Sequence, residues 1–163
     1  MPMFESQLLH AAEQVLQQMR ARHLTLTTAE SCTGGLLSAL ITEIAGSSDV
    51  FTHGYITYAN AAKTTMIGVS ESLIHTHGAV SEPVAVAMAE GALNSSGASI
   101  SVAITGIAGP GGATATKPVG LVHFASARAG GETLHTMQQF SGDRAAVRLQ
   151  AVKAALDLIA QQV

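Results

Sequence analysis

A serine, a cysteine and a threonine stand directly before a pair of glycines in the segment Ser31–Gly35, which reads SCTGG. The residues before it, 24–30, are mostly apolar or β-branched and predict a strand, and residues 33–45 carry apolar side chains at helical spacing. A strand that enters a helix through such a turn directs backbone N–H groups, hydroxyls and the positive end of the helix dipole to one place. The segment is therefore either a binding site for an anion such as phosphate or a capped strand-to-helix turn.

A second glycine-rich segment, residues 106–118, follows another predicted strand at 99–105. It reads GIAGPGGATATKP and is too irregular for a helix or strand, and loops of this length are usually functional or mobile. In an open α/β sheet, loops that leave the carboxyl ends of neighbouring strands meet at one crevice. The two glycine-rich turns together favour one ligand site, although neither matches a GxGxxG or P-loop nucleotide signature.

The single cysteine and two of the histidines are further candidates for chemistry. Cys32, at a helix start, could have a lowered thiol pKa and act as a nucleophile, but a buried unreactive thiol is the commoner state and no histidine is placed to pair with it. His75 and His77 stand two residues apart beside a glycine and are interpreted as surface residues. No spacing of His, Asp or Glu predicts a metal site.

Ser48, Tyr58 and Lys63 form another candidate group. Ser48 lies in a loop before the predicted strand 51–59, Tyr58 lies near the end of that strand, and Lys63 comes early in the next helix. A lysine at a helix start opposes the helix dipole, as does Arg144 at the start of the last helix, and both invite a functional explanation. A partly buried lysine can lose its proton near neutral pH and serve as a base for a serine hydroxyl.

The remaining segments alternate between helices and strands. Amphipathic or alanine-rich helices are predicted at 5–22, at 82–95 and after Asp143, where Leu149, Val152, Leu156 and Ile159 form the buried side. Short helices are predicted near 60–67 and 70–78, and a hairpin at 119–128 and 132–140. This order predicts one α/β domain over residues 1–163, with helices on both faces of a mixed sheet.

The composition of the 163-residue chain restricts its partners and location. Hydrophobic residues make up 47% and charged residues 12%, which suits a sizeable core. A net charge of −3 does not indicate the basic surface that binds nucleic acid. The chain has no apolar run of the roughly 18 residues that cross a membrane, and its single cysteine suits a reducing compartment. We therefore expect a cytoplasmic protein that binds neither nucleic acid nor membrane.

Eight motifs resemble those of the CinA C-terminal domain family, in the same order and with few gaps. They are AESCTGG (29–35), GSSDVF (46–51), GYITYANAAK (54–63), IGV (67–69), HGAVSEPVA (77–85), TGIAGPGG (105–112), KPVG (117–120) and SGDR (141–144). Stand-alone members of that family hydrolyse the carboxamide of nicotinamide mononucleotide (NMN) to nicotinic acid mononucleotide and ammonia, in NAD recycling. The resemblance implies the same reaction here, with no metal or cofactor, in a three-layer α/β/α sandwich that commonly forms a homodimer.

The resemblance also implies roles for individual residues. Ser48 would be the nucleophile, Lys63 the general base and Tyr58 an assisting hydroxyl. The substrate pocket would be formed by Glu30, Ser31, Thr33, Gly34, Gly35, Thr105, Gly106, Gly109 and Arg144. Two positions depart from the family pattern, because Ala59 stands where serine is frequent and residues 113–116 are less polar than usual.

The sequence leaves two alternatives open. Ser31 could be the nucleophile in place of Ser48, and comparison of the two alanine variants would decide. The protein could also be a non-catalytic module that binds a pyridine nucleotide through the same two glycine-rich turns. Such a module would not need Ser48 or Lys63, so the presence of Ser48, Tyr58 and Lys63 together favours the enzyme.

Overall fold

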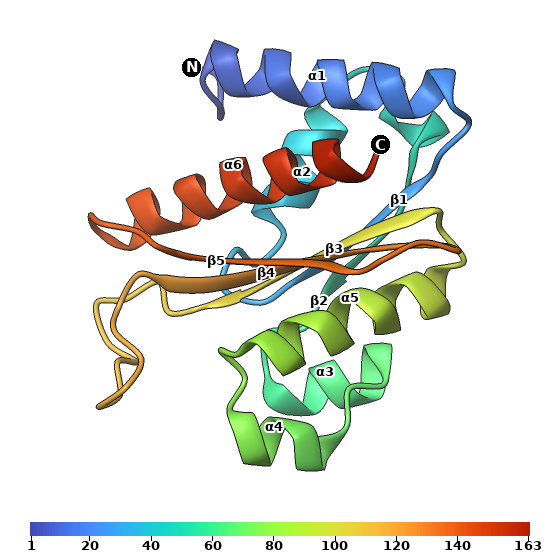
Figure 1. Ribbon diagram of the computed structural model, residues 1–163. Helices are drawn as coiled ribbons and strands as arrows, with labels where there is room; N and C mark the ends of the chain where they lie inside the picture. The colour runs from blue at the N-terminus through green and yellow to red at the C-terminus, as the bar shows by residue number, and fades with distance from the viewer.

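The computed structural model describes residues 1–163 and contains a five-stranded sheet between two layers of helices (Figure 1). Its elements are α1 (Ser6–Ala21), β1 (Leu26–Glu30), α2 (Leu36–Glu43), the 3-10 helix η1 (Ser47–Asp49), β2 (Phe51–Ile56), α3 (Asn60–Ile67), α4 (Glu71–His77), α5 (Glu82–Ser96), β3 (Ile100–Gly106), β4 (Leu121–Arg128), β5 (Leu134–Gln139) and α6 (Arg144–Gln162). The strand order is β2-β1-β3-β4-β5. Strands β2, β1 and β3 are parallel, β4 is antiparallel to β3, and β5 is antiparallel to β4. The predicted α/β sandwich with a mixed sheet is confirmed.

The two faces of the sheet carry side chains of different size. Helices α1, α2 and α6 lie over one face (Figure 1), where large side chains are buried: Leu26, Ile100, Val102, Ile104, Val122 and Phe124. Helices α3, α4 and α5 lie over the other face, where the strands contribute Ala29, Ala103, Ala125 and Ala127. A Cβ on Gly91 of α5 would collide with the carbonyl oxygen of Ile67. Small residues thus let α3, which carries Lys63, pack closely against α5.

The turn before α2 is longer than the sequence predicted. Helix α2 begins at Leu36 rather than at residue 33, because Gly34 and Gly35 have φ angles of +57° and +99°. These left-handed conformations suit glycine and interrupt the helix. Residues 31–35 therefore form an open turn at the carboxyl end of β1.

Two other sequence predictions are corrected. Strand β2 ends at Ile56 rather than at residue 59, because its partner β1 ends opposite, at Glu30. Leu149, predicted on the buried side of α6, is 43% exposed, and the neighbouring Val147 and Ala151 are buried instead. His75 and His77 are exposed, as interpreted from the sequence, and lie in α4 within the short helix predicted at 70–78.

Local capping explains where several helices begin. The side chains of Ser70 and Asp143 each accept a hydrogen bond from the backbone N–H three residues later, at the starts of α4 and α6. The hydroxyl of Ser81 before α5 instead donates to a carbonyl in the preceding turn. Because Asp143 caps α6, Arg144 is the first residue of that helix. None of the helices combines the length and the apolar character needed to traverse a bilayer.

Candidate active site

A serine and a buried lysine meet at the carboxyl end of β1. Ser31 directly follows β1, and Lys63 projects from the first turn of α3. The Nζ atom of Lys63 lies 3.1 Å from the Oγ atom of Ser31. It also lies 2.9 Å and 3.4 Å from the carbonyl oxygens of Thr57 and Tyr58. Ser31 is 8% exposed and Lys63 is 1% exposed, so the pair is almost fully shielded from water.

The surroundings of Lys63 favour its neutral form. Burial lowers the pKa of Lys63 from its usual 10.5, and no carboxylate forms an ion pair with it. A neutral amine has two N–H donors and one lone pair, and its neighbours here are two carbonyl oxygens and one hydroxyl. The carbonyl oxygens of Thr57 and Tyr58 can accept both N–H groups while the lone pair accepts the proton of Ser31.

A pocket of about 240 Å³ opens beside Ser31. The turn after β1, Tyr58, the glycine-rich loop and the start of α6 form its wall, which comprises Ser31, Cys32, Tyr58, Gly106, Ile107, Ala108, Gly109, Gly111, Gly112 and Arg144. The guanidinium of Arg144 donates to the carbonyl oxygen of Gly109 at 2.8 Å and to the hydroxyl of Tyr58 at 3.2 Å. Both glycine-rich turns thus line one pocket, with an exposed cation at its rim.

The start of α2 already holds a carboxylate of the protein itself. Glu30 is fully buried. It accepts five hydrogen bonds: from the Thr33 hydroxyl (2.6 Å), the Gly35 N–H (3.2 Å), the Leu37 N–H (3.0 Å), and the N–H (2.8 Å) and hydroxyl (2.7 Å) of Ser38. Thr33 and Gly35, considered from the sequence as ligands for a phosphate, therefore bind Glu30, whose charge also suits the helix dipole. Glu30 does not line the pocket.

Cys32 lines the pocket, but its thiol is not activated. Burial raises the pKa of Cys32 to about 11, so the thiol remains protonated at neutral pH. The backbone of this turn is a better candidate for a catalytic role than the thiol. The N–H groups of Cys32 and Thr33 donate to no other residue, whereas the carbonyl oxygens of Ser31, Cys32 and Thr33 are all engaged. Two free N–H donors beside Ser31 are the kind of group that stabilises an oxyanion.

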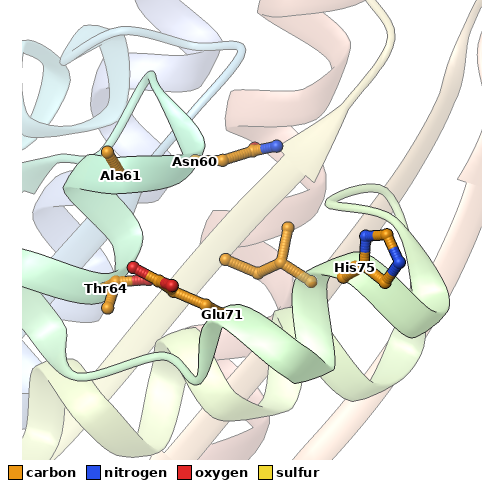
Figure 2. A pocket seen from close by; sticks show the side chains of 6 residues that line it. Asn60, Ala61, Thr64, Glu71 and His75 are labelled. Atoms are coloured by element: carbon orange, nitrogen blue, oxygen red, sulfur yellow. The ribbon is translucent and has the colours of Figure 1, made fainter.

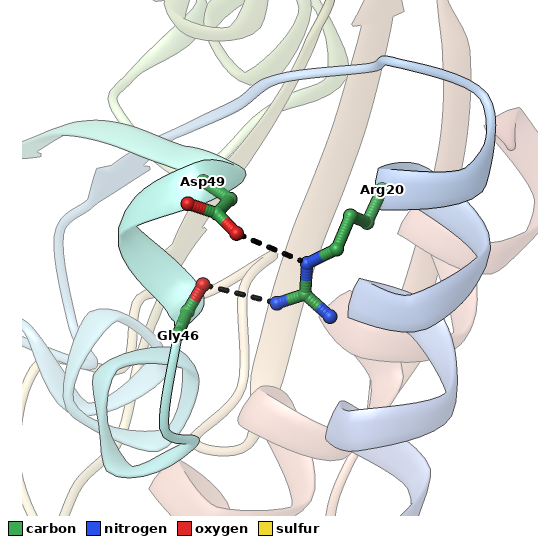
Figure 3. A network of polar contacts seen from close by, with 3 residues as sticks. All are labelled: Arg20, Gly46 and Asp49. Atoms are coloured by element: carbon green, nitrogen blue, oxygen red, sulfur yellow. Dashed lines mark hydrogen bonds and ion pairs between the residues drawn. The ribbon is translucent and has the colours of Figure 1, made fainter.

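Ser48, the nucleophile that the resemblance implies, lies far from this pair. Ser48 precedes β2 and Lys63 follows it, and a six-residue strand spans about 17 Å. Ser48 is exposed, and its turn is tied to α1 by an ion pair between Arg20 and Asp49 (Figure 3). The structure does not bring Ser48 to Lys63, because the whole length of β2 separates them. Ser31 occupies the position next to the lysine.

The remaining predicted residues divide into two groups. Tyr58, Gly106, Gly109 and Arg144 line the pocket. Thr105 does not, because its hydroxyl donates to the carbonyl oxygen of Ala79 at 2.9 Å and its side chain is 1% exposed. Gly34 and Gly35 are also outside the wall and act through the shape that they give to the turn.

Arg148 is a residue of this site that the sequence patterns did not single out. Its guanidinium donates to the carbonyl oxygens of Cys32 and Thr33, at 3.2 Å and 3.0 Å. Arg148 follows Arg144 by four residues, a spacing that places both side chains on the same side of a helix. A second arginine so near a helix start, where the dipole disfavours cations, is the signal that would have revealed it.

A larger opening of about 480 Å³ lies between α3 and α4 (Figure 2). Its lining residues are Asn60, Ala61, Thr64, Glu71, Ile74 and His75. The hydroxyl oxygen of Thr64 is buried without a hydrogen-bond partner, and Glu71 and His75 are exposed. No nucleophile is paired with a base there, and no cluster of metal-ligating side chains is present in the structure. The pocket at Ser31 is therefore the stronger candidate for an active site.

Known proteins resemble this chain over nearly its whole length. The nicotinamide-nucleotide amidohydrolase PncC of Escherichia coli is 54% identical over 160 residues, which cover 98% of this chain and 97% of that protein. The protein of the same name from Enterobacter agglomerans is 50% identical over 149 residues, 91% of each chain. The crystal structure of competence/damage inducible protein CihA from Agrobacterium tumefaciens superposes with a TM-score of 0.94 at 45% identity, covering 98% and 97% of the two chains. Residues 9–163 match the CinA C-terminal domain, and the chain belongs to that family.

Proposed function

We propose that this protein hydrolyses the carboxamide of NMN to nicotinic acid mononucleotide and ammonia, as a step in pyridine nucleotide recycling. The observation that carries the proposal is the buried pair of Ser31 and Lys63, 3.1 Å apart at the edge of a pocket. The names of the Escherichia coli and Enterobacter agglomerans relatives support the choice of substrate. The geometry supports a serine nucleophile with a lysine base, a pairing known to activate serine hydroxyls.

In the first half of the reaction, Ser31 attacks and Lys63 accepts its proton. The Oγ atom of Ser31 forms a bond with the carboxamide carbon, and the amide oxygen becomes an oxyanion. The N–H groups of Cys32 and Thr33 donate to this oxyanion, and one such donor typically contributes about 3–4 kcal/mol to stabilising the transition state. Lys63, now an ammonium, transfers its proton to the amide nitrogen as the C–N bond breaks, and ammonia leaves.

In the second half, water hydrolyses the ester that joins Ser31 to the nicotinoyl group. Neutral Lys63 accepts a proton from the attacking water, and the same N–H groups stabilise the second oxyanion. The proton returns to the Oγ atom of Ser31 when the carboxylate product forms. Throughout both halves, the carbonyl oxygens of Thr57 and Tyr58 hold the Nζ atom of Lys63 in place.

Arg144 is the proposed contact for the phosphate of the substrate. It is exposed at the pocket rim, and it already reaches both the glycine-rich loop and the hydroxyl of Tyr58. Arginine binds phosphate oxygens in a bidentate manner. The start of α2 is not proposed for this role, because Glu30 occupies its donors.

Incubation of the purified protein with NMN tests the proposal. We expect equal amounts of ammonia, measured by a coupled assay, and nicotinic acid mononucleotide, measured by chromatography. Nicotinamide riboside, which lacks the phosphate, should react with a lower kcat/KM, and Arg144→Ala should reduce the difference between the two substrates. Binding of NMN by calorimetry without any ammonia release would instead identify the non-catalytic pyridine-nucleotide module.

A further inference from the structure

Arg148 reaches from α6 to the turn that carries Ser31. Its Nε atom donates to the carbonyl oxygen of Cys32 at 3.2 Å, and its Nη2 atom donates to that of Thr33 at 3.0 Å. A Cβ on Gly34 would lie 3.8 Å from Nη2, so the guanidinium rests directly against the turn. No carboxylate forms an ion pair with Arg148. Its side-chain hydrogen bonds within the protein therefore go to these two peptide groups.

The peptide groups that Arg148 holds determine where the free N–H donors point. In a trans peptide, the C=O of one residue and the N–H of the next point in opposite directions. Fixing the carbonyl of Cys32 therefore fixes the N–H of Thr33. Fixing the carbonyl of Thr33 fixes the N–H of Gly34, which donates to the carbonyl of Ser31 at 3.1 Å and so orients the N–H of Cys32.

We propose that Arg148 is a positioning residue that holds the N–H groups of Cys32 and Thr33 in place for the oxyanion. The inference rests on the proposed function, because it requires Ser31 to be the nucleophile. Arg148 acts through the backbone and does not line the pocket, in contrast to Arg144. Glu30 holds the other side of the same turn, but through the Thr33 hydroxyl and the start of α2, so it does not duplicate the grip on these carbonyls.

The kinetic test compares Arg148→Ala and Arg148→Lys with Lys153→Ala. Lys153 is a matched control, because it is an exposed cation on the same helix with no hydrogen bond to the turn. Loss of an oxyanion donor typically lowers kcat about 10²–10³-fold, so we expect Arg148→Ala to lower kcat by about 10²-fold with KM for NMN unchanged. Lys153→Ala should behave as the wild type. A raised KM with unchanged kcat would overturn the proposal in favour of a substrate contact.

A second readout uses a fluorophosphonate probe in place of NMN. Ser31 displaces fluoride from phosphorus, and the phosphoryl oxygen then occupies the oxyanion position. We expect mass spectrometry to find the wild type labelled at Ser31, and the Arg148 variants labelled more slowly by a factor similar to their loss of kcat. If the wild type is neither labelled nor active on NMN, the proposed function fails. If Arg148→Ala is labelled as fast as a labelled wild type, only the role of Arg148 is overturned.

Thermal unfolding of each variant separates positioning from stability. A folded variant with lower kcat supports the proposal, and a folded variant with wild-type kcat overturns it. If Arg148→Ala does not fold, Arg148→Lys decides, because lysine keeps the charge but lacks the planar fork that holds two carbonyls together. A folded Arg148→Lys with reduced kcat and unchanged KM then supports the role, and wild-type kcat in that variant contradicts it.

Discussion

Ser31 and Ser48 both stand in short turns that contain glycine, yet only one of them has a chemical partner. Ser31 follows the carboxyl end of β1, is 8% exposed and lies 3.1 Å from the amine of Lys63. Ser48 precedes the amino end of β2, is exposed, and belongs to a turn that Arg20 ties to α1 (Figure 3). The residue type is the same, so the difference lies in the end of the sheet that each occupies.

The order of the strands explains why a pocket lies at the carboxyl end of β1 and β3. From the carboxyl end of β1 the chain continues through α2 to β2, on one side of β1 in the sheet, whereas from β3 it continues through the glycine-rich loop to β4, on the opposite side. Neighbouring loops that depart in opposite directions leave a crevice between them. The pocket at Ser31 is that crevice, since its wall comes from the turn after β1 and the loop after β3. Ser48 lies at the opposite end of the sheet, before the amino end of β2.

Alanine variants of the two serines should give the largest contrast. Ser31→Ala removes the proposed nucleophile, and loss of a catalytic serine can cost on the order of 10⁶-fold in kcat, so we expect ammonia release from NMN to fall by at least about 10⁴-fold. Ser48→Ala should stay within about twofold of the wild type, as is usual for an exposed side chain outside a site. Ammonia assays on both folded variants measure the contrast. Wild-type turnover in Ser31→Ala would reverse the assignment.

Replacement of Lys63 by methionine should have the next largest effect. Lys63→Met keeps most of the buried stem but removes the base, and general bases typically contribute about 10²–10⁴-fold to rate. Because burial lowers the pKa of Lys63, kcat/KM in the wild type should rise as pH rises through that lowered pKa and level off below pH 10.5. A pH–rate profile measures this, and a flat profile in the wild type would argue against a lysine base.

The same pKa shift has a consequence for stability with a definite sign. Between the lowered folded pKa of Lys63 and the ordinary 10.5, the unfolded chain binds the proton and the folded chain does not. The contribution of Lys63 to the free energy of unfolding therefore rises with pH in that window. Denaturant titrations at several pH values should show that Lys63→Met is less dependent on pH than the wild type, and an identical slope would contradict the shift.

The contrast between the serines also marks the limit of what the sequence could predict. Helices and strands such as α1, β3 and α6 follow from local periodicity and caps, and they were predicted within a few residues. The contact between Ser31 and Lys63 joins residues 32 positions apart. It depends on how closely α3 packs against α5, and the periodicity of neither helix predicts that packing.

The internal position of Glu30 could have been inferred from the sequence, although the resemblance placed Glu30 in the substrate pocket. Side chains along a strand alternate between the two faces of a sheet. Thr28 and Glu30 both bind Ser38 of α2 on one face, so Ser31 belongs to the opposite face, toward Lys63 of α3. Strand alternation alone therefore separates an internal carboxylate from the adjacent serine, which faces Lys63.

Replacement of Glu30 by glutamine should affect stability more than chemistry. The NH₂ group of glutamine would face donors of α2 that now bind a carboxylate, and a buried donor without an acceptor costs about 1–3 kcal/mol. We expect the free energy of unfolding of Glu30→Gln to fall by about that amount, while kcat falls far less than in Ser31→Ala. Glu43→Gln, at the exposed end of the same helix, is the control and should leave both quantities unchanged. Equal stability of the two variants would show that the five hydrogen bonds of Glu30 are dispensable.

The smallest effect should come from the other end of the sheet, where Arg20 holds the turn of Ser48. The Nε atom of Arg20 lies 3.4 Å from a carboxylate oxygen of Asp49, and its Nη2 atom donates to the carbonyl oxygen of Gly46 at 3.0 Å (Figure 3). The two charged side chains are 40% and 66% exposed, and exposed ion pairs contribute only about 0.2–1 kcal/mol. Arg20→Ala should therefore lower the free energy of unfolding by no more than that, less at high salt, and leave ammonia release unchanged. A large loss of activity in Arg20→Ala would mean that the turn of Ser48 is coupled to the site across the full length of β2.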